Sequence, residues 1–163
     1  MPAGSTYSTI ATTTLGSAQA SYTFSSVPST YTDLVLIVNG SMSAPQNIGV
    51  EFNGDSGGNY SFVRIYGDGS AAYSDGVSNT VFSYLGIMDG GQGSLVASIQ
   101  NYANTTTFKT SLGRGNATSS GYVSAYVSTW RSTSAINAVK VLPAGANTLS
   151  SGTVLTLYGI AAA

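Results

Sequence analysis

The sequence contains little charge, no histidine and no cysteine. Only 7% of its 163 residues are charged, compared with about 25% in an average globular domain. Histidine and cysteine supply the commonest general base, the usual nitrogen and sulfur metal ligands and the thiolate nucleophile, so their absence removes most catalytic chemistries. We therefore expect a protein that is not an enzyme, with no catalytic residues, no metal and no cofactor.

Basic residues are too few and too scattered to bind nucleic acid. The net charge is −1, whereas nucleic-acid binding needs a stripe of Lys and Arg along one surface. No apolar run approaches the roughly 18 residues of a membrane-spanning helix. Residues 1–19 also lack the basic and continuous apolar regions of a signal peptide. We expect neither nucleic acid nor a membrane among the partners.

Short runs rich in Val, Ile, Thr and Tyr alternate with Gly, Asn, Asp and Ser, which is the pattern of strands separated by turns. The run Leu34–Val38 is apolar on both faces and predicts a central strand. The run Gly93–Ala103 also has helical spacing, but its surroundings favour a strand. The predicted strands are Ser5–Leu15, Ala20–Ser25, Asp33–Ser41, Asn47–Asn53, Tyr60–Tyr66, Asn79–Met88, Ser94–Tyr102, Thr106–Leu112, Gly121–Trp130, Ala135–Val141 and Val154–Gly159.

Many short, evenly spaced strands predict an all-β fold, a two-sheet β-sandwich of the jelly-roll kind. We assign residues 20–163 to the sandwich and residues 1–19 to an N-terminal arm or edge strand. Half of the segment Pro2–Leu15 is Thr and Ser, and it buries too little by itself to offset its ordering entropy. We expect another subunit or another protein to supply its contacts, by accepting it as an added strand.

Four aspartates lie in or beside glycine-rich clusters, which could form either turns or calcium loops. None has the spacing of an EF-hand, and Gly and Asn favour the positive φ of tight turns. We therefore interpret these clusters as turns. The four residues are Asp55, Asp68, Asp75 and Asp89.

Tyrosines and the apolar residues of the arm are the candidates for contact with a partner. Eleven tyrosines could stack on sugars, but Tyr is also a common core and strand residue. Tyr60 and Tyr73 lie in or beside loops, and Tyr7 and Ile10 are large apolar residues of the arm. We predict these four as partner-contact residues.

Two stretches resemble a β-sandwich module of tailed bacteriophages. The first is Ala20–Val38 (ASYTFSSVPSTYTDLVLIV) with Phe52–Ser61 (FNGDSGGNYS), and the second is Ile136–Ile160 (INAVKVLPAGANTLSSGTVLTLYGI). The module occurs in virion surface proteins: capsid decoration or cement proteins, head fibres and tail-fibre tips. Its motifs SYTFSSVP, YTDLVL, FNGDSG and LYGI are structural, so the resemblance implies a place on the virion and no catalytic residues.

Three functions follow as alternatives. The first is a capsid decoration or cement protein on the capsid surface of the virion, bound to the major capsid protein as a homotrimer, a state that the resemblance implies. The second is a tail-fibre or receptor-binding domain that recognises a host surface glycan. The third is an enzyme or a cellular lectin, because six acidic residues still allow a catalytic carboxylate pair.

Overall fold

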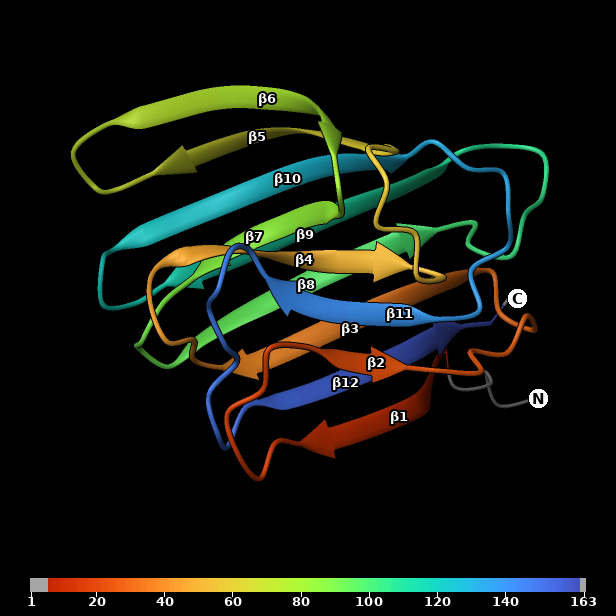
Figure 1. Cartoon of the computed structure of the whole chain (residues 1–163), viewed down its shortest axis with the longest axis horizontal. Helices are drawn as coiled ribbons and strands as arrows, with labels where there is room; N and C mark the ends of the chain where they lie inside the picture. The colour runs from red at the N-terminus through yellow and green to blue at the C-terminus, as the bar shows by residue number, and fades with distance from the viewer. Residues whose placement is uncertain (1–5, 162–163) are drawn as a thin grey trace.

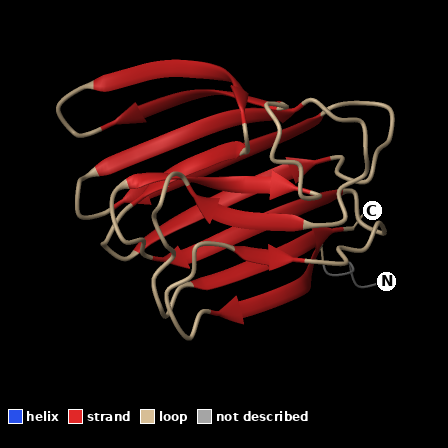
Figure 2. Ribbon diagram, viewed as in Figure 1, coloured by secondary structure: helices blue, strands red, loops and turns tan. Residues whose placement is uncertain are grey.

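A computed structural model describes residues 6–161, which form strands joined by turns and loops (Figure 1). This range contains no helix, and so none long and apolar enough to cross a membrane (Figure 2). In chain order the strands are β1 (Tyr7–Thr14), β2 (Tyr22–Phe24), β3 (Asp33–Gly40), β4 (Gln46–Phe52), β5 (Tyr60–Gly67), β6 (Ala72–Thr80), β7 (Ser83–Met88), β8 (Gly93–Gln100), β9 (Lys109–Ala117), β10 (Tyr122–Trp130), β11 (Val139–Pro143) and β12 (Val154–Ile160).

The strands form two antiparallel sheets that pack face to face. The large sheet has eight strands in the order β1-β12-β3-β8-β9-β10-β5-β6, and the small sheet has four in the order β2-β11-β4-β7. The predicted all-β, jelly-roll-like β-sandwich is therefore confirmed. The small sheet covers one face of the large sheet, while β5 and β6 extend beyond it (Figure 1). We call the opposite face of the large sheet, turned away from the small sheet, the outer face.

Where β12, β3 and β8 face the small sheet, apolar side chains fill the core between the two sheets. Alternate side chains of β3 point inward, and Leu34, Leu36 and Val38 are fully buried. Burial of one such side chain contributes about 1.5–3 kcal/mol. At one end of this core the rings of Phe52 and Trp130 lie 5.5 Å apart. β3 lies between β12 and β8, in the central position that its apolar run predicted.

The packing differs where β7 crosses β9 and β10, because there the backbones approach each other. A Cβ atom at Gly113 of β9 would overlap the carbonyl oxygen of Leu85 in β7. A Cβ atom at Gly86 of β7 would come within 2.6 Å of Leu95 Cδ1, closer than two non-bonded carbon atoms approach in folded proteins. Glycine at these positions therefore permits the close contact, which we call the seam.

Serine hydroxyls of β10 bond to the backbone of β7 across the seam. The backbone N–H of Ile87 donates to Ser124 Oγ (3.1 Å), and Ser128 Oγ donates to the carbonyl oxygen of Tyr84 (2.6 Å). β7 is an edge strand of the small sheet, and a buried backbone group without a partner costs about 1–3 kcal/mol. The serines therefore satisfy backbone groups of β7 and join the two sheets.

Several predicted strands need correction. β9 begins at Lys109 and continues to Ala117, past the predicted end at Leu112, and β11 begins at Val139, after the predicted start at Ala135. No strand was predicted at Ala72–Thr80, because β6 is exposed along its length and carries no alternation of apolar and polar residues. The predicted strand Asn79–Met88 is consequently wrong at its start, since β7 begins at Ser83.

The N-terminal segment forms an edge strand of its own chain. β1 pairs with β12 from Tyr7 to Thr14, and Leu15 is buried in the core. Residues 1–5 of the predicted arm lie outside the described residues. The contacts that we expected from a neighbouring chain come instead from β12, because its edge beside β1 would otherwise be unpaired.

Candidate functional site: the outer face of the large sheet

Apolar side chains align across neighbouring strands on the outer face. The strand register places Val63 of β5 opposite Val127 of β10, and Val127 opposite Leu112 of β9. Ile65 of β5 likewise lies opposite Ala125 of β10. Together with Val123, these residues form one surface on β5, β10 and β9. We call this surface, made of Val63, Ile65, Leu112, Val123, Ala125 and Val127, the outer patch.

Most side chains of the outer patch are open to solvent. The exposed fractions are 62% for Val63, 63% for Ile65, 62% for Val123 and 52% for Val127. An antiparallel sheet with one solvated face normally carries polar side chains on that face. A contiguous exposed apolar surface on a folded protein marks a site that binds another molecule. The outer patch is therefore the strongest candidate for the functional site.

The outer face is hollowed along the patch. Three adjoining hollows have volumes of about 720, 500 and 430 Å³. The first lies over β5, β6, β10 and β9 and is also lined by Tyr73, the second lies over β5, β10, β9 and β8 near Val96, and the third lies over β6, β5 and β10 near Ser78. We call these three hollows together the trough. Its floor is aliphatic and its margins carry Ser and Thr residues. The trough therefore fits an apolar surface better than a charged ligand.

Arg114 adds one positive charge to the trough. It lies on β9 between Ala125 of β10 and Val96 of β8, it is exposed, and it borders two of the hollows. Among the described residues, no carboxylate lies within ion-pair distance of its guanidinium. A partner could therefore place one acceptor here, while the rest of its contact would be apolar.

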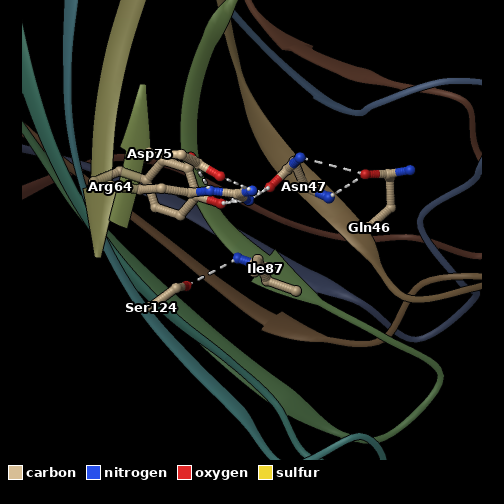
Figure 3. A network of polar contacts seen from close by, with 7 residues as sticks. Gln46, Asn47, Arg64, Asp75, Ile87 and Ser124 are labelled. Atoms are coloured by element: carbon tan, nitrogen blue, oxygen red, sulfur yellow. Dashed lines mark hydrogen bonds and ion pairs between the residues drawn. The ribbon is translucent and has the colours of Figure 1, made fainter. Parts of the chain in front are cut away.

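Behind the trough, Arg64 fixes the overhanging end of the large sheet to the small sheet (Figure 3). Its Nε and one terminal nitrogen donate to the two oxygens of Asp75 at 2.6 and 2.8 Å. Its other terminal nitrogen donates to Asn47 Oδ1 at 3.0 Å and to the Tyr126 hydroxyl at 2.9 Å. The bonds from Arg64 hold the pKa of Asp75 below its usual value. This network links β5, β6, β10 and β4, and so sets the position of the strands beneath the patch.

Three tyrosine rings lie beside this network on the inner face, beyond the small sheet. Tyr66 stacks on Tyr73 with ring centroids 5.0 Å apart, and Tyr122 lies 6.2 Å from Tyr66. The Arg64 guanidinium lies over the Tyr66 ring at 4.4 Å. Tyr73 is 44% exposed, so part of this aromatic cluster is open to solvent.

The aspartates of the glycine-rich clusters accept hydrogen bonds from their own loops or from neighbouring elements of the chain. Asp68 accepts the backbone N–H groups of Ser70 and Ala71; these bonds, with that of Ala71 the largest contribution, lower its pKa to about 2. Asp89 is buried and accepts from Gly91 and from both the backbone and hydroxyl of Ser120. Within residues 6–161 no three acidic side chains lie close enough together to hold a metal ion.

The four predicted contact residues occupy different environments. Tyr73 is exposed in the aromatic cluster, Tyr7 is exposed on β1, and Ile10 is half-buried against the core. Tyr60 is fully buried; its hydroxyl donates to the Asp55 carbonyl oxygen at 2.9 Å and accepts the N–H of Phe52 at 3.0 Å. Its ring therefore fills the core and is not available to a partner, because the loop beside it folds over the end of the sandwich.

None of the four predicted residues belongs to the outer patch. The sequence signal for the patch is the alternation in β10, where Val123, Ala125 and Val127 share one face. Such an apolar face would ordinarily be assigned to the core. Only the structure shows that it points outward, because the serines of the opposite face meet β7.

Comparisons with known proteins give no family. No family model matches the sequence, and no curated protein matches it significantly. Among solved structures, the galectin LEC-6 of Caenorhabditis elegans aligns with a TM-score of 0.40 and 8% identity, over 89% of this chain and 94% of the galectin. The alginate lyase Aly36B aligns with a TM-score of 0.38 and 10% identity, over 91% of this chain and 77% of the lyase. These scores are too low to carry a functional inference.

Proposed function

We propose that this chain is a non-catalytic surface protein of a tailed-bacteriophage virion, a decoration or cement protein that binds the major capsid protein through the outer patch. The single observation that carries the proposal is the exposed apolar outer patch, on the face where a solvated sheet would normally be polar. The phage assignment rests on the resemblance of the sequence motifs.

The chemistry of the outer face suits attachment to a protein surface. Val63, Val123 and Val127 project little more than aliphatic groups, and their burial against a partner is favourable in proportion to the apolar area removed from water. Arg114 and Arg64 are the charged residues that line the hollows, and Arg64 is paired with Asp75, so attachment should change little with ionic strength.

The motifs that resemble the phage module lie apart from the outer patch. They fall in β2, β3, β11 and β12 and in the turn from β4 to β5, where they build the ordinary core. The outer patch comes from β5, β9 and β10, between the two resembling stretches. This division fits a shared scaffold whose intervening strands carry the contact surface of the individual protein.

Reconstitution on virions tests the proposal. Virions made without the chain are mixed with purified protein, and the bound copies are counted by gel densitometry and located by cryo-electron microscopy. We expect copies on the capsid, and we expect Val127→Lys to reduce binding at least tenfold, because the charge would be desolvated in the interface.

Val81→Lys is the matched control. Val81 is 51% exposed, nearly the same as Val127, but it lies between β6 and β7, outside the outer patch. Binding that Val127→Lys leaves intact, or that Val81→Lys weakens equally, would contradict attachment through the outer patch. Absence of the protein from the capsid would contradict the function itself.

The second candidate is a tail-fibre or receptor-binding domain that recognises a host glycan. The aromatic cluster favours it, because Tyr73 offers a partly open ring beside the polar side chains of Arg64 and Asp75, and sugar recognition combines ring stacking with hydrogen bonds to planar polar groups. Location on the tail, together with glycan binding that Tyr73→Ala abolishes and Val127→Lys leaves intact, would favour this function over capsid decoration.

A further inference from the structure

Within residues 6–161 the two sheets have four edges, and three of them are protected. An unprotected edge offers a row of free N–H and C=O groups to any other strand. β1 carries a bulge between Thr9 and Ala11, β2 has only three residues, and β7 lies on the large sheet with its backbone bonded by Ser124 and Ser128. Bulges, short strands and cover are the usual protections of an edge.

β6 is the exception. Its pairing with β5 is regular from Ala72 to Ser78, and its only irregularity lies beyond this stretch. Eight of its nine residues are exposed, and its sequence, AYSDGVSNT, contains neither the Pro nor the Lys that commonly protects an edge. Its single charge, Asp75, is neutralised by Arg64 at 2.6 Å. β6 is therefore a long, regularly paired and exposed edge whose single charge is held in an ion pair with its own neighbouring strand.

We propose that β6 pairs with β6 of a second copy of this chain, antiparallel about a twofold axis at Gly76, to make one continuous sheet across a dimer. The proposal is independent of any role on a virion. Twofold pairing is the commonest symmetry of homo-oligomers, and a net charge of −1 leaves little repulsion between copies.

The charge on β6 selects the register. An axis at Asp75 would set two carboxylates directly opposite each other, which is unfavourable. An axis at Val77 would shift the pairing toward Asn79, whose φ is +60° and where pairing with β5 is irregular. An axis at Gly76 places Asp75 opposite Val77 of the second copy and keeps the central pairs within residues 74–78, so that Asn79 is reached only at the end of the pairing, opposite Tyr73.

The same register matches side chains on both faces. On the outer face, Ser74 lies opposite Ser78 of the second copy, and Thr and Ser pairs are favourable cross-strand neighbours. On the inner face the pairing covers Val77 and Tyr73, which are 49% and 44% exposed in the single chain. The two outer faces become continuous, so a dimer would present two outer patches on one side.

This pairing replaces the homotrimer expected from the family resemblance. A trimer needs a different surface on each side of every contact, whereas β6 is complementary to itself.

The first test uses charge pairs at positions 74 and 78, with the oligomeric state measured by sedimentation of purified protein at micromolar concentrations. We expect a dimer for the natural chain. Ser74→Lys with Ser78→Lys sets lysines opposite each other in both pairs and should weaken the dimer at least tenfold. Ser74→Lys with Ser78→Glu sets Lys opposite Glu in both pairs, so it should retain the dimer. Thr9→Lys with Thr14→Lys, on the edge strand β1, is the matched control and should also remain a dimer.

The second test uses cysteine, which the natural chain lacks. In the double variant Ser74→Cys/Ser78→Cys, the cysteine at position 74 of one copy lies opposite the cysteine at position 78 of the other. Their Cβ atoms are about 4.5–5.5 Å apart, near the range of a disulfide. In either single variant the two cysteines are about 13 Å apart along the strands. Mild oxidation of dilute protein should therefore crosslink the double variant and neither single variant.

A natural chain that is trimeric overturns the proposal, as does a monomer whose double-cysteine variant fails to crosslink. Equal crosslinking by the single variants, or a dimer that the lysine pair leaves unchanged, overturns the β6 register. Circular dichroism of each variant verifies that it is folded.

Discussion

The two halves of the sandwich solve the same packing problem in opposite ways. In the half built by β12, β3 and β8, side chains such as Leu36 point inward and the sheets are held apart by a layer of apolar groups. In the half built by β9 and β10, the inward positions beneath β7 include Gly113, Ser124 and Ser128, and the backbone of β7 lies directly on them. Aliphatic side chains of the same strands, Val127 among them, face outward.

The comparison shows that the polarity of a strand face does not by itself identify the core. A backbone that approaches a sheet closely requires small residues beneath it and hydrogen-bond partners for its polar groups. Glycine and serine supply both at the seam. The seam therefore requires small residues directly beneath β7, although Tyr126 and Trp130 of the same inner face of β10 are buried. The outer face of these strands carries exposed aliphatic side chains that a partner could cover.

The largest expected effect comes from filling the seam. Gly113→Ala places a Cβ atom against the carbonyl oxygen of Leu85, and because both groups are backbone, one sheet must shift. We expect a loss of about 3 kcal/mol or more in the free energy of unfolding, measured by urea denaturation. In the control Gly16→Ala the new Cβ atom meets no heavy atom within 4 Å, so the change should stay within about 0.5 kcal/mol. Similar losses in the two variants would mean that the sheets do not touch at β7.

A smaller change in the free energy of unfolding should distinguish two buried serines on β9 and β10. Ser128→Ala removes the hydroxyl that donates to the Tyr84 carbonyl oxygen at 2.6 Å and should cost about 1–3 kcal/mol. Ser111 Oγ is buried without a hydrogen-bond partner among the described residues, so Ser111→Ala removes an unsatisfied group and should be neutral or stabilising. Equal destabilisation by the two changes, measured in the same urea experiment, would contradict the claim that the Ser128 hydrogen bond stabilises the packing of β7.

The smallest effect is expected from pH between about 5 and 9, because no histidine titrates there. The pKa of Asp68 is about 2 and that of Asp75 is below its usual value, so their contribution is complete above the unfolded pKa near 4 and is lost as pH falls toward 2. Burial raises the pKa of Tyr126, so its contribution is complete below about pH 10 and is lost above it.

Acid should act unevenly on the two halves. Asp68 and Asp75 both lie in the β5–β6 hairpin, whereas the core around β3 is apolar. Hydrogen exchange at low pH should therefore accelerate in β6 before β3. A urea midpoint that changes strongly between pH 5 and 9, or exchange that rises first in β3, would contradict this account.

Much of the fold follows from local patterns in the sequence. The run Leu34–Val38 specified a central strand because it is apolar on both faces, and glycine-rich clusters such as Asn53–Gly58 specified turns. The sequence does not predict β6, because a strand that is exposed on both faces needs no alternation of apolar and polar residues. Its conformation comes from pairing with β5 and from the bonds of Arg64 to Asp75 and Asn47, 11 and 17 residues away in the sequence, which the alternation within a single strand does not reveal.

The sequence by itself determined that this protein is all-β, nearly neutral and without the residues of common catalytic sites, because composition and short-range alternation carry that information. It also separated the two faces of β10. Only the tertiary structure decided which of those faces points outward, because that choice depends on where β7 lies. The outer patch and the open edge at β6 are products of the same long-range packing, which local periodicity does not encode.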